Sequence, residues 1–156
     1  MTTIVAGTSL RLIELGTKVD EAAAVLPATA TGHIFTVSGG RVAITALIGL
    51  CTTVCSATAT TLAIGTTPSV GTASTTSLAS ATAVTSKEVG TMVGLGATAG
   101  AALIVGTNAA SPLVLPEPVI VSAGTIDITT SAANTGAFSW SCLYIPIDDG
   151  ATVTGF

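Results

Sequence analysis

Charged residues are scarce in this chain. Asp, Glu, Lys and Arg make up 8% of its 156 residues, against about a quarter in an ordinary soluble domain. Aromatic residues are scarcer still, at 3%, and the mean hydropathy is +0.82. A surface built from such a chain cannot be largely ionic, so we expect either a membrane or neighbouring subunits to cover much of it.

A membrane helix is weakly supported. The best stretch, residues 90–106, holds 17 residues without a charge, which is at the lower limit for a spanning helix. Its Gly-x-x-x-Gly spacings would help helices approach closely. Its five glycines and two threonines give poor helix propensity, and no Lys or Arg cluster flanks it. The first ten residues also lack the basic start and apolar run of a signal peptide.

Basic residues form no stripe along the sequence. The net charge is −4, and the four cations are scattered at Arg11, Lys18, Arg41 and Lys87. Phosphate neutralisation needs clustered Lys and Arg, so we expect no nucleic-acid partner. The acidic residues are equally dispersed apart from Asp148 and Asp149, and they indicate no electrostatic partner.

Strong helix formers are almost absent, whereas Thr, Ala, Ser, Val and Gly dominate. This balance favours strands and turns. Gly, Asn and Pro residues recur at short intervals and divide the chain into many short segments, which is typical of a β-sandwich or barrel. The length suits one domain with a single core.

Two long strands stand out. A strand over residues 34–37 is predicted to form a hairpin with one over residues 41–51 through Ser38-Gly39-Gly40, and the second strand should be central because both of its faces are apolar. Another strand starts near Ala137. The remaining predicted strands are a pair at 119–121 and 125–129, and two in the Thr-rich region at 60–64 and 77–84. Three prolines, Pro112, Pro116 and Pro118, confine the segment before residue 119 to an edge or loop.

Residues 1–32 differ in character from the sandwich region at 33–156. Charges cluster between Glu14 and Glu21, and Asp20 is predicted to cap a short helix through Leu26 that Pro27 ends. This segment is either an arm laid over a neighbouring subunit or the first strand of the same domain.

Catalytic chemistry finds little support. His33 is the only histidine, and no Gly-x-Ser-x-Gly motif indicates a nucleophile to accompany it. An ordinary histidine at the start of a strand is the better interpretation. We therefore expect no enzyme activity.

The three cysteines, Cys51, Cys55 and Cys142, are too few and too oddly spaced for a disulfide framework. With His33 they match the ligand types of a Cys3His zinc site. On an extended strand, however, Cys51 and Cys55 would lie roughly 13 Å apart at about 3.3 Å per residue. Buried free thiols, made in a reducing cytoplasm, are favoured over zinc and over a disulfide that involves Cys142.

Three other patterns have structural explanations that outweigh functional ones. Gly94-Leu95-Gly96 with Gly100 departs from the dinucleotide-binding spacing. Asp148-Asp149-Gly150 offers no further calcium ligands and reads as a solvated turn. The aromatic residues Phe138, Trp140 and Tyr144 share a strand face, which suits a core or subunit interface better than a ligand platform. The sequence thus assigns no catalytic, cofactor-binding or metal-binding residue.

Several segments together resemble a family of small structural proteins of tailed bacteriophages, some of which decorate the capsid. The resemblance spans most of the chain and rests on turn and strand signals: GTKVD at 16–20, the segment 32–42, EVGT at 88–91, GTIDI at 124–128, SAANTG at 131–136, FSWS at 138–141 and YIPIDDGATV at 144–153. Family membership would imply a jelly-roll β-sandwich, trimeric association and a place in the virion.

We therefore expect an all-β, antiparallel jelly-roll-like sandwich with an extended N-terminal segment, synthesised in the host cytoplasm and located on the outer capsid surface. The expected role is to decorate and stabilise the capsid as a homo-oligomer, with a trimer as the expected state, in contact with the major capsid protein and without cofactor, membrane or nucleic acid. The alternatives are a tail or fibre-associated virion protein and a small membrane-associated protein.

Overall fold

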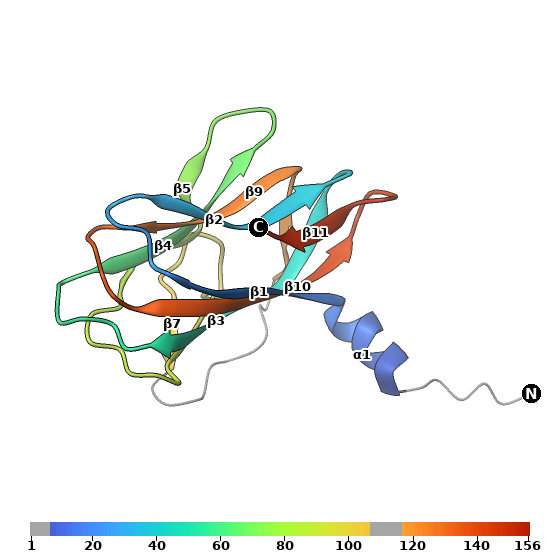
Figure 1. Cartoon of the computed structure of the whole chain (residues 1–156). Coiled ribbons are helices and arrows are strands. Elements are labelled where there is room, and N and C mark those ends of the chain that lie inside the picture. Colours follow the sequence, from blue (N-terminus) through green and yellow to red (C-terminus); the bar gives the residue numbers. More distant parts are fainter. Residues whose placement is uncertain (1–6, 107–116) are drawn as a thin grey trace, which may run out of the picture.

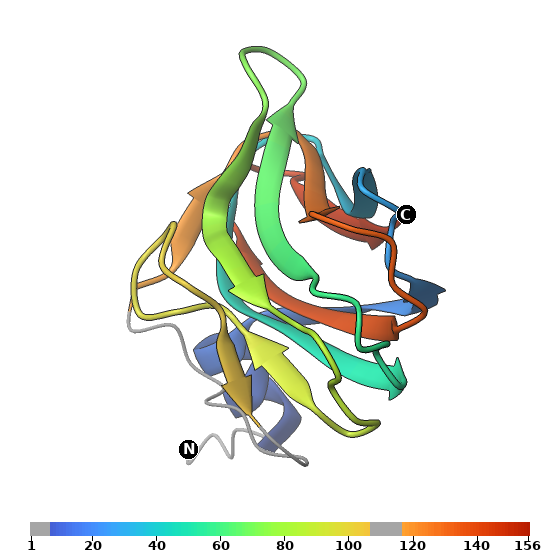
Figure 2. The ribbon, with the colours of Figure 1, turned by 90° about the vertical axis from the view of Figure 1, so that its left-hand side faces the viewer.

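The computed structural model describes residues 7–106 and 117–156, and these residues are almost entirely β-structure. Two antiparallel sheets pack face to face, with one helix beyond the edge of the layers (Figures 1 and 2). The elements are α1 (Gly7–Leu15), β1 (Thr17–Val25), β2 (Thr31–Ser38), β3 (Val42–Thr53), β4 (Thr61–Pro68), β5 (Ser74–Ala83), β6 (Met92–Gly94), β7 (Ile104–Gly106), β8 (Val119–Val121), β9 (Gly124–Thr130), β10 (Ala137–Pro146) and β11 (Thr152–Gly155).

The strand order is that of a jelly roll. One sheet has the order β1-β10-β3-β6-β7, with β8 also paired to β3, and the other has the order β11-β2-β9-β4-β5. The pairings are nested along the chain: β1 with β10, β2 with β9, β3 with β8, and β4 with β5. A chain folded back on itself as a long double ribbon and then rolled into two sheets gives this arrangement. The predicted antiparallel β-sandwich is confirmed.

The core lies between β10 and β3 of one sheet and β2, β9 and β4 of the other. β3 is central, as predicted, and its residues are buried on both faces over much of its length. Trp140 of β10 stands opposite Gly49 of β3, where a Cβ atom would lie 2.7 Å from the indole ring and from Val93. Gly49 therefore leaves the space that the largest side chain of the core occupies.

Both hairpins predicted from the sequence are wrong in their pairing, although their strands exist. β2 and β3 belong to different sheets, and so do β8 and β9. Gly39 and Gly40, with φ of 74° and 146°, and Gly124, with φ of 148°, turn the chain from one layer to the other. A glycine-rich turn fits a hairpin and a crossing between layers equally well, and only the partner strands from distant sequence decide between the two.

The helix predicted from Asp20 to Leu26 is wrong. Residues 17–25 form β1, which pairs with β10 from Thr17 opposite Tyr144 to Val25 opposite Ala137. The alanines of this segment favour a helix, but without β1 the backbone groups along one side of β10 would lack partners, and pairing outweighs propensity. The segment directly after residue 16 is thus the first strand of the domain, and the helix lies before it.

The uncharged stretch at 90–106 is not a helix. It forms β6, a turn and β7 at one edge of a sheet. Within the described residues, every helix is too short or too polar to span a membrane. The Thr-rich region forms β4 and β5, close to the predicted strands. Pro112 and Pro116 lie outside the described residues, and Pro118 directly precedes β8.

Candidate functional site

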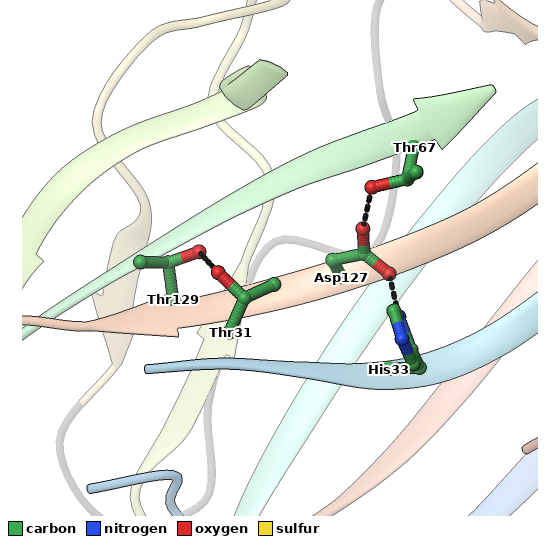
Figure 3. Close-up of polar contacts among 5 residues, drawn as sticks. All are labelled: Thr31, His33, Thr67, Asp127 and Thr129. Atoms are coloured by element: carbon green, nitrogen blue, oxygen red, sulfur yellow. Dashed lines mark hydrogen bonds and ion pairs between the residues drawn. The ribbon is translucent and has the colours of Figure 1, made fainter. Parts of the chain in front are cut away.

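A polar cluster joins three neighbouring strands of the second sheet (Figure 3). Asp127 of β9 has a side chain that is 3% exposed. One carboxylate oxygen lies 2.6 Å from Nδ1 of His33 on β2, and the other accepts a hydrogen bond of 2.5 Å from the Thr67 hydroxyl on β4. Because β9 lies between β2 and β4, a single buried carboxylate links all three strands.

The arrangement differs from a catalytic triad. In a triad the imidazole lies between the hydroxyl and the carboxylate, so that it can accept the proton of the nucleophile. Here the carboxylate lies between the imidazole and the hydroxyl. The ring of Phe156 packs against the imidazole with a centroid distance of 4.9 Å. The geometry therefore supports a structural link among β2, β9 and β4.

The His33 link is expected to stabilise the fold. Replacing His33 with Ala leaves the buried Asp127 carboxylate without one of its two partners, and we expect the free energy of unfolding to fall by about 2 kcal/mol, because the lost bond involves a charged acceptor. Urea denaturation measures this change.

The matched control lies on the same strand pair. Thr31 and Thr129 share an exposed hydrogen bond of 2.9 Å between their hydroxyls, drawn beside the cluster in Figure 3. Thr31→Ala should cost less than about 0.5 kcal/mol, since water replaces an exposed partner. Equal losses of unfolding free energy in the two variants would show that the His33–Asp127 contact stabilises the fold no more than an exposed hydrogen bond does.

The cysteines are buried and unpaired, as predicted. Burial raises the pKa of Cys142 to about 12 and that of Cys55 to about 11. The zinc ligand set is not brought together: the described residues contain no cluster of three His, Cys, Asp or Glu side chains. Cys51 lies in β3, and Cys55 lies two residues beyond the end of that strand at Thr53, where its N–H donates to the Lys87 carbonyl at 2.9 Å.

The turn at Asp148 is held by an ion pair. The Asp148 carboxylate accepts hydrogen bonds from the guanidinium of Arg41, at 2.9 Å from Nε and 2.7 Å from Nη2, and from the Arg41 backbone N–H at 2.7 Å. These bonds lower the pKa of Asp148 to about 2 and raise the pKa of Arg41. Asp148 and Asp149 thus lie in a turn, as the sequence predicts, and the Asp148 carboxylate is already paired with Arg41.

The Arg41–Asp148 pair predicts a pH dependence. Because the folded-state pKa of Asp148 lies below its ordinary value of 3.8, its contribution to stability is present above that value and is lost as the pH falls through about 2. The melting temperature of wild type should exceed that of Asp148→Asn near neutral pH, and the difference should vanish near pH 2. Asp149→Asn, an equal charge change one residue away, is the control; a similar pH-dependent difference there would contradict the prediction.

The aromatic residues of β10 belong to the core. Phe138, Trp140 and Tyr144 are 0%, 2% and 6% exposed, and the first two rings stack with a centroid distance of 6.0 Å. None is available to a ligand on the surface. Gly94 ends β6, and Gly100 lies in the turn that follows. The glycines at 94, 96 and 100 thus belong to a strand and a turn, as predicted, and do not form a dinucleotide-binding loop.

An apolar surface lies where α1 meets the sandwich. We call Leu10, Leu12 and Ile13 of α1, together with Ile145 of β10, the α1 patch. These side chains are 54%, 54%, 70% and 38% exposed. Beside them a pocket of about 190 Å³ is lined by Leu12, Gly16, Thr17, Tyr144, Ile145 and Pro146. Exposed apolar side chains around a pocket are typical of a contact surface for another protein.

The end of α1 is fixed to the sandwich while its start points away. The hydroxyl of Thr45 in β3 donates to the Leu15 carbonyl at 2.6 Å, and the Gly16 N–H caps the helix on the Leu12 carbonyl at 3.0 Å. From this anchor the helix extends beyond the two sheets (Figure 1). The α1 patch therefore lies outside the two packed sheets, on a helix whose last residue is bonded to β3.

Comparison of the chain with family models, curated proteins and solved structures gives no match. The function must therefore be argued from the residues themselves. Of the candidate residues, His33 lies in a cluster whose centre, Asp127, sequence reasoning missed. The available signal was a single carboxylate between Ile126 and Ile128, in a strand whose two faces are both buried.

Proposed function

We propose that the chain is a structural virion protein that decorates and stabilises the capsid of a tailed phage as a homo-oligomer. The α1 patch is the observation that carries the proposal. A helix with three large exposed apolar side chains, held clear of the sandwich, costs free energy in water unless another protein surface covers it.

The remaining surface supports an assembled state. Further large apolar side chains are exposed at other places, including Val25 on the edge strand β1 and Ile120 on β8. Because charged residues make up 8% of the chain, its surface does little to keep isolated subunits apart in water. Neighbours that bury about 800 Å² per partner would remove this exposure.

The proposed action is adhesive. Each subunit would contact its copies and the major capsid protein, and the repeated lattice would turn individually weak contacts into firm attachment. The sequence resemblance to phage structural proteins supports this role, and the jelly-roll fold is compatible with it. Fold alone does not decide function.

The deciding experiment mixes the purified protein with capsids that lack it and images them by cryo-electron microscopy. Ordered density at symmetry-related positions on the outer shell is the expected result. Bare capsids with density at the tail would instead make it a tail or fibre-associated protein. A monomer by light scattering at micromolar concentration would contradict the homo-oligomer.

The α1 patch is tested by Leu10→Ser combined with Ile13→Ser. Because both side chains are largely exposed, the fold should remain intact by circular dichroism while occupancy on capsids or self-association falls at least tenfold. Val70→Ser is the matched control, since Val70 is 90% exposed on a distant turn. Unchanged assembly in the α1 variant would remove the proposed contact.

A further inference from the structure

Among the described residues, β1 provides the only sheet edge that is both long and open. The edge strands β7 and β8 have three residues each, and β11 has four. The edge of β5 is covered by the chain that follows β6. There the Ser80 N–H donates to the Ala101 carbonyl at 3.0 Å, and the Gly100 N–H donates to the Leu78 carbonyl at 3.1 Å. β1 has nine residues and pairs with β10 on one side only.

The free side of β1 keeps backbone groups available for pairing. In an antiparallel sheet, alternate residues of an edge strand point their N–H and C=O groups away from the paired neighbour. β11 of the other sheet approaches β1, so that a Cβ atom on Gly155 would lie 3.2 Å from the Asp20 carbonyl oxygen. Within the described part of the chain, however, no backbone hydrogen bond outside the ladder with β10 involves β1. Its lateral edge is therefore open to another strand.

The first half of β1 is regular and carries charges of alternating sign. From Thr17 to Glu21 each residue pairs with β10 without a shift in register, and the irregularity comes between Glu21 and Ala24. Val19 packs against the core, so its neighbours Lys18 and Asp20 share the opposite face. Their side chains are 57% and 60% exposed, and Nζ of Lys18 lies 2.8 Å from Oδ1 of Asp20.

We propose that β1 of a second copy of this chain binds this edge in the antiparallel direction, centred on Val19, and joins the two sheets into one. The inference rests on the proposed homo-oligomer and names its contact. In this register Lys18 of each copy stands opposite Asp20 of the other, while each Lys18 keeps the Asp20 of its own strand. The four charges then alternate around a square, with like charges only on its diagonals, and directly opposite charges of unlike sign stabilise a strand pair.

The charges also select this pairing over others. Charged side chains on an edge strand keep unrelated strands away. In a parallel copy in the same register, Lys18 would face Lys18 and Asp20 would face Asp20, which is unfavourable. The antiparallel pair has two-fold symmetry. It therefore predicts a dimer, whereas the family resemblance implies a trimer.

The same register gives the α1 patch a surface to contact. Residues 22–25 of the second copy run past Gly16, directly after the end of α1. These four residues are all exposed, Val25 by 65%, and they span about 13 Å at roughly 3.3 Å per residue. α1 has nine residues and spans a similar length, at about 1.5 Å per residue. The apolar end of β1 and the apolar helix thus match in length and cover each other.

Charge exchange tests the register. Lys18→Glu brings four acidic side chains together and Asp20→Lys brings four basic ones together, so each variant should self-associate about tenfold more weakly than wild type, or weaker still, by sedimentation equilibrium. An equimolar mixture of the two variants should form a heterodimer. The double variant Lys18→Glu/Asp20→Lys should regain the affinity of wild type. Lys87→Glu, the same charge change away from β1, is the control, and circular dichroism checks that each variant is folded.

Hydrogen exchange gives a second measurement that needs no variant. As the concentration of wild-type protein rises through the dissociation constant, the backbone amides of residues 17–21 should exchange more slowly, because half of them gain a partner strand. The amides of β11, another edge strand, should not change. Exchange at 17–21 that is independent of concentration would overturn the pairing. So would a trimer by sedimentation, or single charge variants that associate as wild type does.

Failure of this pairing is distinguishable from failure of the proposed function. If Lys18→Glu and Asp20→Lys occupy capsids as oligomers with the affinity of wild type, the virion role stands and the β1 pairing is refuted. If wild type dimerises through β1 but leaves capsids bare, the pairing stands and the capsid role is lost. A wild-type monomer refutes the pairing and the homo-oligomer together, and cryo-electron microscopy then decides on capsid binding alone.

Discussion

Gly65→Ala is expected to lower the free energy of unfolding by about 3 kcal/mol, although it adds only one methyl group. Gly65 lies in the middle of β4. A Cβ atom there would lie 2.6 Å from both the Cα and the carbonyl carbon of Thr75 in β5. Both are backbone atoms, so no side-chain rotation can relieve the clash.

The register explains why β5 comes so close. Ile64 pairs with Ala79 and Thr66 pairs with Ser74, so the step across Gly65 is matched by several extra residues in β5. This bulge folds over the glycine. On its other side Gly65 pairs with Asp127, and any displacement of β4 would also disturb the carboxylate that links β2, β9 and β4.

Gly32→Ala is the matched control for Gly65→Ala. Gly32 is on β2 of the same sheet, and a Cβ atom there would meet its nearest neighbour, the Pro27 ring, at 3.5 Å, an ordinary contact. Reduced freedom of the unfolded chain should make this variant neutral or more stable by up to about 1 kcal/mol. Urea denaturation of both variants gives the comparison, and a loss below 1 kcal/mol for Gly65→Ala would refute the argument.

Phe138→Ala is expected to cost 3–5 kcal/mol, roughly the range for removing a fully buried phenyl group. Phe138 is 0% exposed and stacks on Trp140. It also lies in β10, the strand between β1 and β3. The cavity left by the phenyl ring would therefore open in the hydrophobic core, beside a strand that is held by hydrogen bonds on both sides and cannot easily move to fill it.

Phe156→Ala provides the comparison for the same chemical change at the surface. Its side chain is 67% exposed and contacts the His33 ring, so we expect a loss of about 1 kcal/mol or less. Chemical denaturation of the two variants should differ in midpoint with an unchanged slope. Similar midpoints would mean that the core around Phe138 tolerates the cavity.

The strands of this fold follow from local sequence, but their partners do not. Alternating apolar residues and turn glycines predicted the strands now seen as β2, β3 and β10. The pairing failed at Gly39-Gly40, because a turn of this composition permits either a hairpin or a crossing between layers. The sheet that β2 and β3 each join is set by their partners β9 and β10, which lie about ninety residues away in the chain.

The helix error has a related cause. Ala22, Ala23 and Ala24 have high helix propensity, and no local feature reveals that β10 offers a free edge to them. Asp127 was passed over because its partners, His33 and Thr67, come from two other strands and share no sequence motif with it.

The nested strand order has a consequence for synthesis on the ribosome. Since β10 lies between β1 and β3, and β9 between β2 and β4, neither sheet can close until residues near the C-terminal end of the chain have emerged. Early strands must wait unpaired, with their apolar faces exposed. We therefore expect slow folding that is completed only after β10 has been synthesised, and insoluble products from chains that stop before Ala137.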